Sequence, residues 1–227
     1  LEAVQYQKDK ERGRLDREDF EKEPWMPVLQ RVIPMKVHAH RADDILTAIR
    51  IAKEFNIDIT IDHGTEAHLI VDEVKASGFP VIVGTDLTSR SKLEVQNMNF
   101  KTNKILAEAG VLIAVTTDHP VALIQYLPLC AGLAVKEGLP MEEGLKAITI
   151  NPAKICRVEQ RVGSLEAGKD ADIAIFTGNP MEVFTKTLYT IIDGEIIYNG
   201  MKDEENSEFV PGGSRKDAQK TAAGENE

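Results

Sequence analysis

The feature that most constrains the fold is an alternation of short apolar runs with longer segments of helical periodicity, which begins at residue 31. Strands are predicted at residues 32–38, 57–63, 80–85 and 111–116, and helices at 43–55, 67–76 and 96–109. After the fourth strand, apolar helical sequence continues through residue 135 and again over residues 141–148. Strands that alternate with helices indicate an α/β fold with a parallel sheet and right-handed crossovers. Four such units in about 120 residues correspond to half of an eightfold (β/α)₈ TIM barrel.

The periodicity changes after residue 152. Short β segments are predicted at 162–165, 171–176, 189–192 and 195–198, and Asp193-Gly194 is a strong signal for a two-residue hairpin turn. The sequence therefore predicts a charged helical lead-in (1–30), a half-barrel (31–158) and part of a small β-domain (159–200). Residues 201–227 are polar, with very few apolar side chains, and we predict that they are disordered because they cannot bury enough surface to offset chain entropy.

Charge and composition exclude several partners. The chain carries 27 basic and 37 acidic residues, for a net charge of −10, which argues against binding to nucleic acid. No apolar run approaches the length of a membrane span, and no basic-then-apolar leader is visible. Cys130 and Cys156 each lie within an apolar helical pattern, so we expect reduced core residues in a cytoplasmic protein.

Three residues with metal-binding side chains close predicted strands. His38 ends the first strand, His63 the second, and Asp118 follows the fourth. The carboxyl ends of parallel strands hold the active site in barrels of this kind. Two imidazoles and a carboxylate at one rim are suitable ligands for a divalent ion such as zinc. The alternative is that each histidine is a hydrogen-bonded packing residue, which is the commoner role for a single strand-end histidine.

Longer motifs carry a resemblance to a known family. The runs Lys36-Val37-His38-Ala39-His40, Ile61-Asp62-His63-Gly64 and Val115-Thr116-Thr117-Asp118 resemble strands five, six and eight of the amidohydrolase superfamily. Residues 149–154 (TINPAK) resemble the family's exit from the barrel, and residues 161–173 (RVGSLEAGKDADI) its return into a small β-sandwich domain. The likeness is strongest to the imidazolonepropionase-like branch and covers roughly residues 31–200.

The resemblance implies a site and a reaction. His38 matches a direct metal ligand, and His63 a ligand or a group that polarises the substrate. Asp118 matches a ligand that also accepts a proton from the attacking water. The implied cofactor is a divalent metal, most naturally zinc, as one or two ions. The implied reaction is hydrolysis of a C–N bond in a small-molecule amide or cyclic amide, or deamination, by metal-activated water.

The sequence also departs from the family pattern. The family's first strand carries a His-x-His pair, whereas the one such pair here, His38-Ala39-His40, lies on the strand that matches the fifth. We interpret the chain as the second half of the barrel, completed by a missing N-terminal half or a homo-oligomer partner; the alternative is an inert half-barrel or interaction subunit. Alone it should bind metal weakly, show little hydrolase activity and self-associate through edge strands unpaired at both ends.

Other residues have weaker assignments. His40 is expected to contact the substrate or orient His38, unless it is only a loop residue, and His119 is expected to reach the pocket. Thr85 and Asp86 follow the third strand, where they either line the site or serve the turn. His68 is expected to be structural.

Overall fold

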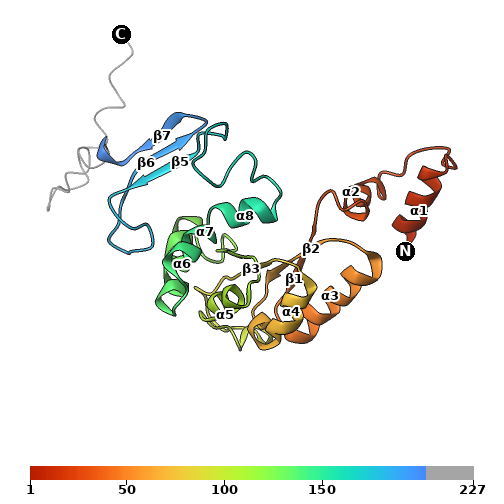
Figure 1. The fold of residues 1–227 in the computed structure, drawn as a ribbon, viewed down its shortest axis with the longest axis horizontal. Coiled ribbons are helices and arrows are strands. Elements are labelled where there is room, and N and C mark those ends of the chain that lie inside the picture. Colours follow the sequence, from red (N-terminus) through yellow and green to blue (C-terminus); the bar gives the residue numbers. More distant parts are fainter. Residues whose placement is uncertain (203–227) are drawn as a thin grey trace, which may run out of the picture.

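The computed structural model describes residues 1–202, and Figure 1 shows two separate sheets within them. The four-stranded sheet lies among the helices, while the three-stranded sheet and helix α1 lie on opposite sides of the view. The tail predicted to be disordered lies, from residue 203 on, outside the described residues.

The larger sheet is parallel, as predicted. Its strands are β1 (Met35–Ala39), β2 (Ile59–His63), β3 (Val81–Val83) and β4 (Ile113–Val115), hydrogen-bonded in the order β1-β2-β3-β4. Strand order follows chain order because each crossover returns through a helix on the same side. All four strands therefore end at one edge of the sheet.

Helices α3 (Ala42–Phe55), α4 (Val71–Ser77) and α5 (Thr102–Ala109) line one side of this sheet (Figure 1). Their apolar faces meet the strands in one core, with Ile45, Ile61 and Leu106 fully buried. Each helix ends at a residue with left-handed backbone: Asn56, Gly78 and Gly110 have φ of 50°, 73° and 87°. Helices α6 (Leu127–Lys136), α7 (Met141–Lys146) and α8 (Ile150–Ile155) follow β4.

The lead-in forms α1 (Glu2–Glu11), the short 3₁₀ turn η1 (Glu23–Trp25) and α2 (Met26–Leu29). Three further 3₁₀ turns precede longer helices or loops: η2 (Ala67–Ile70), η3 (Leu93–Val95) and η4 (Ile124–Tyr126). The helix predicted from residue 96 begins only at Thr102. The side chain of Asn99 accepts a hydrogen bond from the N–H of Lys101 at 3.0 Å, a local turn that competes with the helix.

The smaller sheet is antiparallel and contains β5 (Ile173–Phe176), β6 (Thr187–Ile192) and β7 (Glu195–Asn199) in that order. The predicted hairpin is confirmed: Asp193 and Gly194 have φ of 51° and 82°, as a type I′ turn requires. The strand predicted at 162–165 is wrong. Gly163 has φ of 94°, and a Cβ there would lie 2.8 Å from Ala153 Cβ, so the chain turns closely over α8 instead.

The two edges of the parallel sheet differ. At β4, the side-chain amide of Asn151 donates to the carbonyl of Ile113 at 3.0 Å, and the N–H of Val115 donates to Ala147 O at 2.9 Å. The expectation of unpaired edges at both ends is therefore wrong at β4, because α7 and α8 supply partners there. β1 has β2 as its neighbour on one side and no strand on the other among residues 1–202.

Two further expectations concern membrane-spanning helices and the two cysteines. Within residues 1–202, no helix combines the length and apolar character needed to cross a membrane. Both cysteines are free, and Cys130 on α6 is buried as expected. Cys156 is exposed, so its assignment to the core is wrong: it follows the last residue of α8, where the helix ends at the surface.

Candidate metal centre

His38 and His40 reach the site from the end of β1. Successive side chains of a strand point to opposite faces, and Val37 and Ala39 pack toward the helices. His38 therefore lies on the other face, where it is exposed, and His40 follows the last strand residue and is half-buried. The two rings lie 4.7 Å apart between centroids in an edge-to-face arrangement.

His63 reaches the same place by a different route. The register pairs His63 with Ala39 and pairs His38 with Asp62. Regular alternation would thus turn His63 toward the helices. Instead His63 has φ of 75° and is followed by Gly64 at φ of 53°. This left-handed backbone breaks the alternation, and the His63 ring lies 4.4 Å from that of His38 and 4.6 Å from that of His40.

The three rings form one cluster of ligand atoms. One nitrogen from each of His38, His40 and His63 lies within 4.8 Å of the other two. Two nitrogens of a tetrahedral zinc site, each about 2.1 Å from the ion, lie about 3.4 Å apart, so the ring nitrogens would have to move together by up to about 1.4 Å. Three imidazoles are a donor set that suits zinc and other transition metals.

Two of the rings are held through Nδ1. His63 Nδ1 lies 2.6 Å from Gly84 O, and because a carbonyl can only accept, Nδ1 carries the proton. In the neutral ring, Nε2 of His63 is then left with a free lone pair. His40 Nδ1 lies 2.7 Å from Thr65 Oγ1. Metal-binding histidines in proteins are typically held in this manner through the nitrogen that does not bind the ion.

The electrostatic environment keeps His40 neutral. Burial, together with the neighbouring His63 and His38, lowers the pKa of His40 from 6.5 to about 4. Glu94 opposes this effect, and Lys92 adds to it. A neutral imidazole retains the lone pair that a metal ion needs.

Asp118 and His119 lie after β4. Asp118 is exposed, has φ of 49°, and its N–H donates to Thr116 Oγ1 at 3.1 Å. It is not a member of the histidine cluster. His119 is exposed, and its Nδ1 accepts a hydrogen bond from the N–H of Ile124 at 3.3 Å. The structure therefore brings His38 and His63 together with His40, while a metal-binding role for Asp118 stays a prediction.

Two polar residues follow β3, of which Thr85 is buried and Asp86 is partly buried. Thr85 Oγ1 has no hydrogen-bond partner among the described residues. Burial alone raises the pKa of the Asp86 carboxyl from 3.8 to about 7. The pKa of the Cys130 thiol is raised first by its own burial and second by the charge of Asp86. Asp86 thus interacts electrostatically with Cys130 of α6, and it lies two residues after Gly84, whose carbonyl contacts His63.

Sequence reasoning placed His40 with the substrate and overlooked Thr65. The signal for His40 was present in the sequence, because residues two apart on a strand share a face. No comparable signal marks Thr65, since its contact with His40 depends on how the turn after β2 folds back toward β1.

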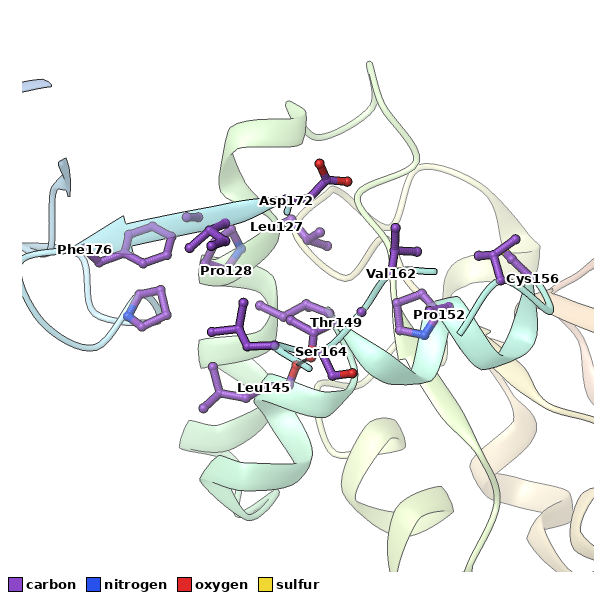
Figure 2. Close-up of a pocket in the computed structure, with 18 residues that line it drawn as sticks. Leu127, Pro128, Leu145, Thr149, Pro152, Cys156, Val162, Ser164, Asp172 and Phe176 are labelled. Atoms are coloured by element: carbon purple, nitrogen blue, oxygen red, sulfur yellow. Dashed lines mark hydrogen bonds between the residues drawn. The ribbon is translucent and has the colours of Figure 1, made fainter. Parts of the chain in front are cut away.

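A separate apolar hollow of about 660 Å³ lies between the helices after β4 and the smaller sheet (Figure 2). Leu127 and Pro128 of α6, Pro152 of α8 and Phe176 of β5 line it, and none of the five histidines does. Its apolar lining suits the packing of the smaller sheet on the helices that follow β4, and it offers no cluster of metal-binding side chains.

Comparison with known proteins finds relatives among the amidohydrolases. A family model described as "Amidohydrolase family" matches residues 28–198. The amidohydrolase tasK of Hapsidospora irregularis is 26% identical over 181 residues, which are 78% of this chain and 18% of that protein. The imidazolonepropionase of Syntrophobacter fumaroxidans is 43% identical over 76 residues, 32% of this chain and 18% of that enzyme.

A solved structure extends the likeness to the fold. The crystal structure of an amidohydrolase from Thermotoga maritima matches with a TM-score of 0.84 and 40% identity, over 87% of this chain and 53% of that chain. The chain thus spans about half of that structure and under a fifth of the two curated relatives.

Proposed function

Because this chain belongs to the amidohydrolase family, we propose that it forms the metal-binding half of a hydrolase that cleaves C–N bonds in small molecules. In this proposal residues 31–158 are strands five to eight of a (β/α)₈ barrel, and residues 159–200 belong to a small β-sandwich domain. The match to about half of the Thermotoga maritima structure supports this division.

The observation that carries the proposal is the arrangement of ring nitrogens in the histidine cluster. His63 presents Nε2 because Gly84 O occupies Nδ1, and Nδ1 of His40 is in contact with the hydroxyl of Thr65. His38 completes the set from the exposed face of β1. We propose that His38, His40 and His63 hold a divalent ion, with zinc as the ion that best suits three imidazoles.

When bound, such an ion supplies Lewis acidity, which lowers the pKa of water and polarises a carbonyl group. The chain's own residues then have distinct roles. Asp118 is the candidate proton acceptor, by the resemblance of its segment to the eighth strand of the family. His119, next to it, is a candidate for contact with the substrate. Both lie in the segment that follows β4, at the same edge of the sheet as the cluster.

The ligand set can be tested by mutation. Zinc content and affinity would be measured by mass spectrometry and chelator competition for His40→Asn, His63→Asn and Asp118→Asn, with His119→Asn as a control outside the cluster. We expect the two cluster variants to lose the metal, while Asp118→Asn and His119→Asn keep it. Retention by His40→Asn with loss by Asp118→Asn would instead support the set of His38, His63 and Asp118 that the family resemblance implies.

The second candidate is a half-barrel that is inert until another chain completes it. The open edge of β1 and the exposure of His38 and Lys36 beside it favour this candidate. A screen of amide, cyclic-amide and deamination substrates with the zinc-loaded chain separates the two. Turnover that is lost in His63→Asn would mean that the chain hydrolyses C–N bonds without another chain, whereas tight metal binding without turnover supports a half-barrel that another chain must complete.

A further inference from the structure

The turn after β2 contacts His40 through two consecutive residues. The Thr65 hydroxyl lies 2.7 Å from His40 Nδ1, and the N–H of Glu66 donates to the carbonyl of His40 at 2.9 Å. Thr65 is only 7% exposed, so water competes little for its hydroxyl. Both the side chain and the backbone of His40 are therefore positioned by the same turn.

This turn is itself tied to two neighbouring segments. The Glu66 carboxylate accepts hydrogen bonds from the N–H of Ala42 at 2.7 Å and from Asn97 Nδ2 at 2.8 Å. The first bond places a negative charge at the N-terminus of α3, where the helix dipole favours it. A separate bond further along the chain, between His68 Nδ1 and Thr102 Oγ1 at 3.0 Å, joins η2 to the buried start of α5 and involves neither Thr65 nor Glu66. Thr65 is thus held in place through its neighbour Glu66.

The direction of the bond between Thr65 and His40 decides what the ring can bind. A neutral imidazole carries one N–H, on either Nδ1 or Nε2. If Thr65 donates to Nδ1, the proton of the ring lies on Nε2, and that nitrogen has no lone pair to offer. If Thr65 accepts from Nδ1, the Nε2 lone pair is open. At His63 the carbonyl of Gly84 imposes the second arrangement.

We propose that Thr65 is a positioning residue whose hydroxyl oxygen accepts the Nδ1 proton of His40 and so leaves the His40 Nε2 lone pair open to the cluster. This role for Thr65 rests on the proposed metal-binding function, but the tautomer of His40 is a property of the metal-free chain. The turn after β2 would then position two ligands. His63 is the last residue of β2, and Thr65, two residues after His63, orients the ring of His40.

The experiment compares Thr65→Val, which keeps the shape but removes the hydroxyl, with Thr65→Ser, which keeps the acceptor. Thr102→Val is the matched control, because it removes another buried hydroxyl, bonded to a histidine outside the cluster. The first readout is the tautomer of His40 in the metal-free protein at neutral pH, from long-range ¹H–¹⁵N NMR, with the signal assigned by its loss in His40→Asn. The second is zinc affinity by chelator competition.

We expect the Nδ1–H tautomer of His40 in the wild type and Thr65→Ser, and a shift toward Nε2–H in Thr65→Val. Zinc affinity should fall by about 10- to 100-fold in Thr65→Val and stay close to wild type in Thr65→Ser and Thr102→Val. An Nε2–H tautomer in the wild type, or equal losses in Thr65→Val and Thr102→Val, would overturn the assignment. If the tautomer shifts as expected but the wild type binds no zinc, the role of Thr65 stands and the metal site fails.

Discussion

The rings of His38 and His63 lie 4.4 Å apart although the strand register pairs His38 with Asp62 and His63 with Ala39. The left-handed backbone of His63 and Gly64 makes this contact, at the point where β2 ends. A non-glycine residue with positive φ is strained, and such strain is often retained where a functional side chain must be aimed.

Gly64 provides a direct test of this arrangement. A Cβ at Gly64 would lie 2.5 Å from Val81 Cγ1, whereas a Cβ at Gly78, also at positive φ, would meet nothing within 4 Å. We therefore expect Gly64→Ala to be less stable than Gly78→Ala by about 1–3 kcal/mol, and to bind zinc more weakly because His63 shifts. Urea denaturation of both variants measures the difference; equal losses would mean that the approach to Val81 imposes no constraint.

The periodicity of the sequence was enough to predict the parallel sheet and the β5–β7 region. The prediction failed at residues 162–165. There the backbone of Gly163 lies close to α8, a tertiary contact that the periodicity of the sequence does not predict. The prediction was also incomplete at the site. The alternation rule groups His63 with Ile59 and Ile61, and only the backbone after Asp62 turns its ring toward His40.

Asp86 makes stability depend on pH near neutrality. Burial raises the pKa of this carboxyl from 3.8 to about 7, so between these values the folded protein holds a proton that the unfolded chain has released. Its contribution is full below the unfolded pKa and is lost as pH rises through about 7, a loss of up to about 4 kcal/mol.

We expect Asp86→Asn to remove this dependence and to be more stable than the wild type above the folded pKa. Thermal or urea unfolding across the pH range measures this dependence, with Asp16→Asn, an exposed aspartate in a bend, as the control. A wild-type stability that does not fall between weakly acidic and weakly alkaline pH would contradict the assignment.

Asp58 should have the opposite effect on the pH dependence of stability, because its stabilising contribution is lost in acid. Hydrogen bonds from Arg31 (2.6 Å) and Arg157 (2.5 Å) lower the pKa of its carboxyl, and Arg157 also donates to the carbonyls of Arg31 and Val32. The contribution of Asp58 is therefore present above its unfolded pKa and is lost as pH falls through the lower folded value.

Both arginines are partly exposed, so solvent screens the interaction and we expect Asp58→Asn to lose about 1–2 kcal/mol at neutral pH. The difference from wild type should shrink in acid. Glu54→Gln removes the exposed pair with Arg50 and should cost no more than about 0.5 kcal/mol. Equal effects of the two substitutions, measured by urea denaturation, would count against a special role for Asp58.

Asn151 is predicted to protect the edge of β4. Its amide donates to Ile113 O at 3.0 Å, and the residue is only 6% exposed, so Asn151→Ala leaves a buried carbonyl without this donor. We expect a loss of about 1–3 kcal/mol and faster hydrogen exchange at the amide of Val115, whose bond to Ala147 O lies along the same edge. Asn97→Ala, which removes an exposed amide bonded to Glu66, is the control and should leave the exchange of Val115 unchanged.

Because an opened edge can pair with another chain, sedimentation should also show more self-association for Asn151→Ala than for the wild type. Unchanged exchange and unchanged association would mean that α7 alone covers this edge.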